Sequence, residues 1–308
     1  MQMLSRRSLL FQSSAALAQE ATFSTGVNVI NLLATVRTRK GELIQTLSQA
    51  DFLLSETGKP QKIQYFSKQT DLPLRLGLLV DISMSQEKVL PAERAAAYRF
   101  LDQVVREKLD KVFLIQFDTL ARVRLGFSNS RKQLEETLND IDTPTRKELQ
   151  ASGGSGTALF DAVASGAELM KAESGRKALI VLSDGVDSSS DHTLPMAIEA
   201  ALRADTLVYA IYFTDAGFYS SFGFGGADGH AVMNRLAKET GAGFFEVTKK
   251  LSIDQIFAQI EQELRSQYSI GYVSDIPVGY PAFRKIQLAT KQKGLIVQTR
   301  DGYWPKRS

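Results

Sequence analysis

The chain has 308 residues, 44% of them hydrophobic, and a formal charge of +3 from 37 basic and 34 acidic side chains. This length and composition allow one sizeable core with a smaller second module, and the balanced charge does not indicate nucleic-acid binding. The absence of cysteine excludes disulfides and thiolate metal sites, and two histidines give little support to a zinc centre. Any metal in this protein is therefore expected to be bound by oxygen.

Residues 1–20 resemble an export signal. Arg6 and Arg7 precede a modest apolar stretch, and the small-residue pattern at 16–18 is typical of a cleavage site. The paired arginines also indicate the twin-arginine route, which exports folded proteins. An uncleaved N-terminus is the alternative, because Gln12 and its neighbours interrupt the apolar stretch. No later segment has the apolar length of a membrane span, so we expect a periplasmic or extracellular protein.

The pattern of apolar residues divides the rest of the chain into three parts. Residues 22–74 alternate between short apolar runs and turns, which predicts a small β module. In residues 75–266, strand-length apolar runs alternate with helical periodicity, which is typical of a parallel sheet covered by helices. Residues 267–304 return to strand alternation. We therefore predict an α/β fold with a doubly wound, mostly parallel six-stranded sheet, and a β module in which the last strands pair with the first.

Three polar segments follow predicted strands or open a predicted helix. Asp81, Ser83 and Ser85 come after the apolar run LGLLV, and their alternation places a carboxylate and two hydroxyls on one side of an extended turn. The loop GGSG delivers Thr157 to the start of a helix, and Asp184 follows the run ALIVLS. Because the loops of a doubly wound sheet open into one crevice at its switch point, we expect these oxygens to converge.

Each segment alone also has an ordinary structural explanation, as a turn, a helix cap or a flexible loop. Their combination, in this order and at the ends of the right elements, favours a metal site. Carboxylates with hydroxyls suit a Mg²⁺-sized ion that keeps several waters. Because neutral hydroxyls leave much of the cation's charge uncompensated, an Asp or Glu carboxylate of a protein partner is the expected additional ligand.

These residues resemble the metal-ion-dependent adhesion site of von Willebrand factor type A domains, over about residues 74–265. The five positions that this family uses are filled by Asp81, Ser83, Ser85, Thr157 and Asp184. The resemblance implies Mg²⁺ as the metal, with Mn²⁺ or Ca²⁺ as alternatives. It also implies that the two serines contact the metal, that Asp81 holds it through water, and that Thr157 and Asp184 exchange direct and water-bridged roles.

The flanks are similar to a secreted bacterial group known as VWFA-related, first grouped from acidobacteria. The similarity lies in ADFLLSETGKPQKIQYFSK before the domain and in LRSQYSIGYVS and RDGYW after it. One departure from the family pattern is Met84, which stands between the two serines where the family usually has Gly. A backbone angle that favours Gly would strain Met84 and weaken the metal site.

The sequence also predicts a ligand-binding rim beside the metal residues. Residues 215–229 are rich in glycine and aromatic side chains and follow a predicted strand, at the edge where open α/β sheets place binding crevices. The predicted rim residues are Gly156, Asp187, Phe218, Tyr219 and Phe222. An aromatic loop packed on the surface, with solvated acidic residues, explains the same composition.

The predicted function is non-enzymatic, metal-dependent binding of a protein ligand. A Mg²⁺-dependent hydrolase is an alternative, because it also needs oxygen ligands at strand ends. The chain has no G-x-x-x-x-G-K-S/T phosphate loop and no G-x-S-x-G elbow, and the place of His192 before a predicted helix favours a surface or capping role over that of a base. A structural protein of the cell envelope, with a purely stabilising metal, is a third alternative.

Overall fold

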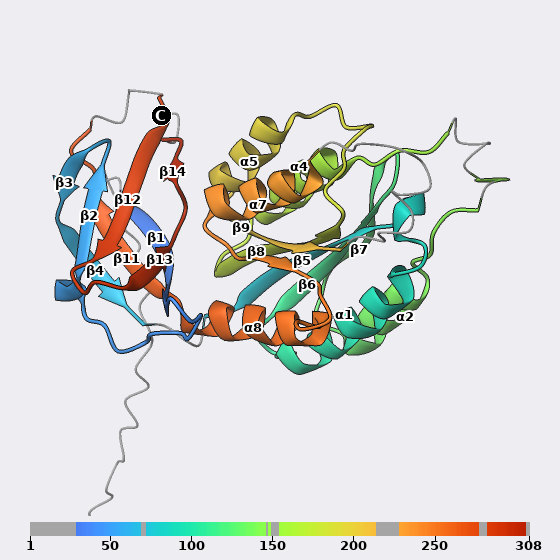
Figure 1. The fold of residues 1–308 in the computed structure, drawn as a ribbon, viewed down its shortest axis with the longest axis horizontal. Coiled ribbons are helices and arrows are strands. Elements are labelled where there is room, and N and C mark those ends of the chain that lie inside the picture. The colour runs from blue at the N-terminus through green and yellow to red at the C-terminus, as the bar shows by residue number, and fades with distance from the viewer. Residues whose placement is uncertain are drawn as a thin grey trace, which may run out of the picture.

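The computed structural model describes residues 29–68, 72–145, 147–148, 154–213, 228–276 and 282–305. They form an α/β domain and, beside it, a β module made from both flanks of the domain (Figure 1). The predicted fold class is confirmed, with its six-stranded sheet and its module of early and late strands. In the described ranges, no helix is long and apolar enough to cross a membrane.

The central sheet has the strand order β10-β9-β8-β5-β6-β7, and only the edge strand β7 runs antiparallel to its neighbour. The strands are β5 (Leu74–Asp81), β6 (Lys111–Phe117), β7 (Ala121–Ser128), β8 (Arg176–Ser183), β9 (Leu207–Tyr212) and β10 (Phe244–Glu246). Because β5 and β8 are parallel neighbours, their carboxyl ends lie at the same edge of the sheet. This edge therefore receives both Asp81 and Asp184.

Helices cover both faces of the sheet, and each face has its own hydrophobic core. One layer contains α1 (Leu90–Val104), α2 (Arg131–Asn139) and α8 (Ile253–Ser266), and the other contains α4 (Leu159–Met170), α5 (Leu194–Arg203) and α7 (Gly229–Thr240). Alternation along β5 serves both cores, since Leu78 packs into the first and Leu79 into the second. Between α1 and α8, Phe100 stacks on Phe257 with ring centroids 4.6 Å apart.

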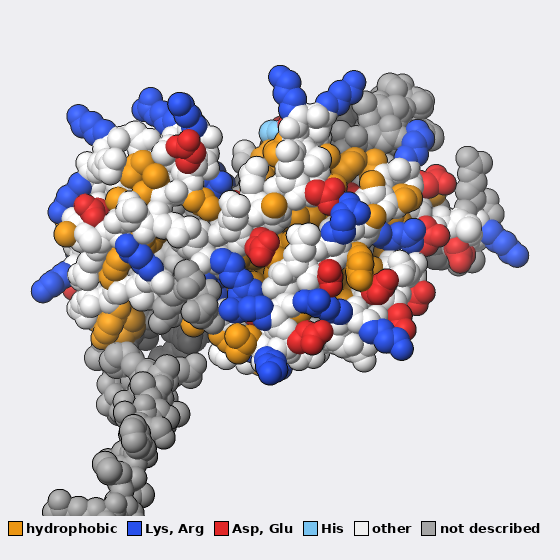
Figure 2. Space-filling model, turned by 90° about the horizontal axis from the view of Figure 1, so that it is seen from below, with side chains coloured by type: hydrophobic (Ala, Val, Ile, Leu, Met, Phe, Trp, Pro, Cys, Tyr) orange, Lys and Arg blue, Asp and Glu red, His pale blue; other side chains and the backbone are white. Residues whose placement is uncertain are grey.

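Acidic and basic side chains are interspersed on the face of the α/β domain that Figure 2 presents. Some form ion pairs between helices, such as Arg99 of α1 with Asp254 of α8 at 2.8 Å. This face therefore carries no single-sign field of the kind that attracts nucleic acid.

The β module consists of two four-stranded antiparallel sheets with one shared core. One sheet has the order β13-β1-β11-β4 and the other β14-β12-β2-β3, so each sheet combines early and late strands. The elements are β1 (Val29–Thr38), η1 (Gln49–Asp51), β2 (Phe52–Glu56), β3 (Lys59–Gln61), β4 (Ile63–Ser67), β11 (Tyr268–Val273), β12 (Arg284–Thr290), β13 (Leu295–Gln298) and β14 (Gly302–Tyr303).

A buried polar cluster joins the two halves of the module. Glu56 of β2 accepts hydrogen bonds from the hydroxyls of Tyr303 and Ser274, each at 2.6 Å. The guanidinium of Arg284 lies 3.9 Å from the same carboxylate, and both charged side chains are buried. Since a buried charge is tolerated only when it is paired, this cluster depends on both chain halves being in place.

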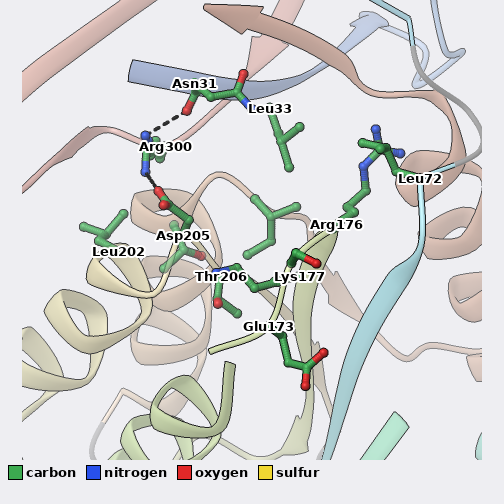
Figure 3. Close-up of a pocket in the computed structure, with 14 residues that line it drawn as sticks. Asn31, Leu33, Leu72, Glu173, Arg176, Lys177, Leu202, Asp205, Thr206 and Arg300 are labelled. Atoms are coloured by element: carbon green, nitrogen blue, oxygen red, sulfur yellow. Dashed lines mark hydrogen bonds and ion pairs between the residues drawn. The ribbon is translucent and has the colours of Figure 1, made fainter. Parts of the chain in front are cut away.

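The module contacts the α/β domain near the amino ends of the parallel strands. Arg300 donates to the Asn31 carbonyl at 2.8 Å and to Asp205, after α5, at 2.5 Å (Figure 3). A cavity of about 260 Å³ lies beside this contact and includes residues from the starts of β8 and β9 in its lining. The described strands of the module lie at this end of the sheet, and the carboxyl edge lies at the other end of the parallel strands (Figure 1).

Asp110 connects three elements at the amino end of the sheet. Its fully buried carboxylate accepts hydrogen bonds from the N–H of Leu74 at 2.8 Å, from the backbone and guanidinium of Arg106, and from Arg265 of α8 at 2.8 Å. Burial alone would raise the pKa of Asp110, but these donors hold it below its usual value. The ionised carboxylate therefore stabilises the fold.

We expect Asp110→Asn to lower the free energy of unfolding at neutral pH by roughly 2–3 kcal/mol, because charge-assisted hydrogen bonds are lost. The difference in stability between the two proteins should shrink as the pH falls below about 4. Asp110 of the parent is then protonated first in the unfolded chain and, at lower pH, also in the folded chain, so that its charge no longer contributes. Urea unfolding at several pH values measures this. Asp102→Asn, which removes a half-exposed carboxylate paired with Arg131, is the control and should cost less than about 1 kcal/mol. Equal effects of the two changes would contradict the role of Asp110.

Candidate metal centre

Asp81 ends β5 and is fully buried. Its Oδ1 accepts a hydrogen bond from the N–H of Ser83 at 2.9 Å, and its Oδ2 accepts one from the hydroxyl of Ser183 at 2.6 Å. Ser183 ends the neighbouring strand β8, and its oxygen accepts the N–H of Gly185 at 3.0 Å. The two strands thus end in one hydrogen-bonded unit.

The two serine hydroxyls connect this unit to the second carboxylate. Ser83 Oγ lies 3.1 Å from Ser85 Oγ, and Ser85 donates to Asp184 Oδ2 at 2.5 Å. The buried Gln86 donates to the same carboxylate oxygen at 2.9 Å, and Asp184 Oδ1 accepts the N–H of Val186 at 3.1 Å. Four of the five predicted metal-binding residues therefore belong to one network.

Thr157, the fifth predicted residue, is buried on the loop before α4. Its N–H donates to Ser188 Oγ at 3.1 Å, and its carbonyl accepts the N–H groups of Ser188 and Ser189 at 2.9 and 3.1 Å. The next residue, Ala158, donates its N–H to the Asp118 carbonyl just after β6 at 2.6 Å. The Thr157 loop is thus fixed between the end of β6 and the loop that follows Asp184.

The predicted rim residues Gly156 and Asp187 take part in the same fixation. A Cβ at Gly156 would lie 2.0 Å from Ser189 Oγ, so a larger residue here would require the Ser189 side chain to move. The Asp187 carboxylate accepts the N–H of Phe160 at 2.9 Å and the hydroxyl of Ser190 at 2.6 Å, which ties its loop to the start of α4. The other three predicted rim residues, Phe218, Tyr219 and Phe222, lie outside the described residues.

Met84 is not strained, so the strain predicted at this position is wrong. Among the described residues other than glycine, only Thr57 and Asp205 have a positive φ angle. Met84 begins the 3-10 helix η2 (Met84–Gln86). The chain therefore turns here with a right-handed backbone that any residue adopts.

His192 lies beside the start of α4. Its Nδ1 is 2.7 Å from Asp161 Oδ1, and its backbone N–H donates to the same carboxylate at 2.9 Å. Burial opposes the ionised form of Asp161, but the hydrogen bonds from His192 and from the N–H of Asp191 together hold the pKa of Asp161 below its usual value. The half-exposed imidazole is thus engaged in a loop contact, in line with the predicted surface role.

Glu93 of α1 is a further acidic residue near the site, and the sequence motifs do not single it out. Both of its carboxylate oxygens are buried and have no hydrogen-bond partner in the described part of the chain. Burial, together with the charges of Asp81 and Asp184, raises the pKa of Glu93 well above its usual value. The burial of Glu93 could have been predicted from helical spacing, because Glu93 lies three residues after Leu90 and four before Ala97, on the same buried face of α1.

The electrostatics and the donor set fit a hard divalent cation. Burial and, as a second cause, the charge of Asp184 raise the pKa of Asp81 to about 7, so a cation beside Asp81 would stabilise its ionised form. Among the described residues, no three His, Cys, Asp or Glu side chains lie close enough to hold a metal, so a cation here needs hydroxyl ligands as well. Ser83 and Ser85 bring two hydroxyl oxygens to the Asp184 carboxylate, and oxygen ligands are what Mg²⁺ prefers.

The fold and the site define an α/β domain with a candidate metal centre at the carboxyl edge of its sheet. The von Willebrand factor type A domain profile matches residues 76–259, more than half of the chain, and the protein belongs to this family. No curated protein is similar enough to the chain to count as a match.

The solved structures that are similar to this chain are distant from it in sequence. A von Willebrand factor type A protein from Catenulispora acidiphila is 12% identical, with a TM-score of 0.50, over 92% of this chain and 75% of its own. The conserved hypothetical protein BatB from Bacteroides thetaiotaomicron is 18% identical, with a TM-score of 0.46, over 63% of this chain and 100% of its own. The PilB minor pilin from Streptococcus sanguinis is 13% identical, with a TM-score of 0.45, over 65% of this chain and 62% of its own. At these identities the likeness concerns the fold.

We expect Gly156→Ala to lower the free energy of unfolding by about 1–3 kcal/mol, because the added methyl group displaces the Ser189 hydroxyl and crowds the Ser188 hydroxyl that accepts the Thr157 N–H. Urea unfolding measures the change. The matched control is Gly126→Ala on the exposed strand β7, where a Cβ meets no atom within 4 Å and should change stability by less than about 0.5 kcal/mol. A neutral effect of Gly156→Ala would show that the loop is not packed as described.

Proposed function

We propose that this protein binds another protein through a divalent cation, and that it is not an enzyme. The cation would be held by Asp81, Ser83, Ser85, Thr157 and Asp184. The observation that carries the proposal is the network at the carboxyl edge of the sheet, in which two buried carboxylates and two serine hydroxyls are joined by hydrogen bonds. Members of the family commonly mediate metal-dependent protein interaction or adhesion, which supports this assignment.

The proposed metal is Mg²⁺, with Mn²⁺ or Ca²⁺ as alternatives. When bound, it supplies a positive charge that an Asp or Glu carboxylate of the partner can complete. The protein's own side chains do the positioning, since Ser183 orients Asp81 and Gln86 orients Asp184. We place Phe218, Tyr219 and Phe222 at the rim of the same site as part of the proposal.

We further propose that the protein is exported and acts in the periplasm or outside the cell. The arginine pair in residues 1–20 and the likeness of the flanks to the secreted VWFA-related group support this. In the described residues, the two flanks fold together into one β module beside the α/β domain. We therefore propose that the flanks and the domain are exported together as one folded protein.

The first test is metal-linked stability, measured as thermal unfolding in Mg²⁺ and in EDTA. The parent should gain about 2.7 kcal/mol when Mg²⁺ is at 100 times its dissociation constant. Asp81→Asn should show no gain from Mg²⁺, and in EDTA it should be at least as stable as the parent, because the repulsion with Asp184 is removed. Asp191→Asn, an exposed position on the loop after β8, is the control and should respond to Mg²⁺ like the parent. An equal gain in the Asp81→Asn protein would rule out this metal site.

The second test is capture of a partner from the native envelope fraction on the immobilised protein. We expect a ligand that is retained in Mg²⁺, released by EDTA and not captured by Asp81→Asn, while Asp191→Asn captures it normally. Neutralising acidic residues of the captured protein one at a time should then identify the carboxylate that contacts the metal. A partner retained equally in EDTA would argue against metal-dependent recognition, and turnover of a phosphoester that requires Mg²⁺ would replace the proposal by an enzymatic function.

A further inference from the structure

A groove lies between helix α5 and the β module, and none of the five proposed metal-binding residues lines it. Its volume is about 460 Å³. Pro195, Ile198 and Leu202 of α5 form one apolar wall, and residues beside β12 and β14 form the opposite wall. Grooves of this size, largely apolar and at the junction of two modules, are typical ligand-binding places.

The wall contributed by the module is aromatic. Phe283 and Trp304 line it together, with ring centroids 5.3 Å apart and a tilt of 58° between the rings. Phe283 is 37% exposed and Trp304 is half-buried, so part of this wall is open to a ligand. The guanidinium of Arg203 lies 5.2 Å from the Trp304 ring, which shows that a cation is already tolerated against this indole.

Acidic side chains predominate among the charged residues of the groove, which are Glu199, Glu239, Asp301 and Lys285. Glu199 is paired with Arg203 at 2.7 Å. Glu239 is paired with Arg235 at 2.5 Å. Lys285, the basic residue in the lining, forms no ion pair within 4 Å in the described part of the chain.

Asp301 is the carboxylate left to receive a ligand. Its N–H donates to the Glu239 carbonyl at 3.1 Å, which fixes its backbone. Within the described residues, no hydrogen bond or ion pair engages its carboxylate. Partial burial raises the pKa of Asp301, and the charges of Lys238 and Lys285, which act without an ion pair to Asp301, offset this only in part. A positively charged donor in direct contact would supply the hydrogen bonds that this carboxylate lacks.

We propose that this groove is a second docking site, for a polypeptide segment of a partner in which an Arg or Lys stands next to an apolar residue. The cationic group pairs with Asp301, and the apolar neighbour packs against Phe283 and Trp304. The apolar walls select such a segment over a simple amine, because burial of an apolar side chain adds to the ion pair. This site recognises chemistry opposite to that proposed for the metal centre, where the partner presents a carboxylate.

The chain's single tryptophan makes the proposal directly testable, because Trp304 emission reports on this groove alone. The full-length protein is titrated with the capped peptide Leu-Arg-Leu, and fluorescence and heat of binding are recorded in parallel. We expect saturable binding with a dissociation constant on the order of 1 mM, as suits one ion pair with apolar contact. The same peptide with citrulline in place of arginine, equal in shape but uncharged, should bind roughly tenfold more weakly.

Asp301→Asn keeps the shape of the groove and should weaken binding of Leu-Arg-Leu by a similar factor, roughly tenfold. The control is Glu136→Gln, which removes an exposed carboxylate on α2 and should leave binding unchanged. The titration should give the same result in Mg²⁺ and in EDTA, so its failure is distinct from failure of the metal site. No heat and no emission change, equal binding of the citrulline peptide, or unchanged binding by Asp301→Asn would each overturn the proposal.

Discussion

Two buried carboxylates at the carboxyl edge of the central sheet are the constraint on which the functional site depends. Parallel pairing of β5 with β8 brings Asp81 beside Ser183 and places Asp184 one residue further on. Taking both carboxylates out of water while they repel each other is unfavourable. The hydrogen bonds from Ser183, Ser83 and Gln86 offset part of this cost, and the remaining negative charge is what a divalent cation would compensate.

The loops around this pair are held in place before any ligand arrives. The loop after β8 is tied to the start of α4 through Asp187 and Ser190, and to the Thr157 backbone through Ser188. Gly156 also lies close to the Ser189 side chain of the same loop. Such fixation means that binding does not have to order these segments, so less of the interaction energy is lost to entropy.

The described strands of the β module lie at the other end of the parallel strands from the metal edge. Early and late strands share both of its sheets, and the Glu56 cluster is complete only when the two chain halves meet. The contact of Arg300 with Asn31 and Asp205 then joins module and domain. The groove between α5 and the module, lined by Phe283 and Trp304, also lies at this junction. The module thus contributes a surface to which a partner could bind. A partner held at both places would gain affinity from the linkage of two contacts.

The sequence by itself determined the features that depend on local pattern: the alternation of strands and helices, the return to β structure after residue 266, and the oxygen-rich segments at strand ends. Helix α8 (Ile253–Ser266) is one of the helices that the alternation in residues 75–266 predicted, and its capping box and apolar periodicity are both local features. Only the tertiary structure decided what depends on packing between distant segments. The hydrogen bond of Asp187 to the start of α4 and the groove beside Trp304 belong to this second group. In each of these cases the neighbours that define the environment lie on other elements, and spacing along one element carries no information about them.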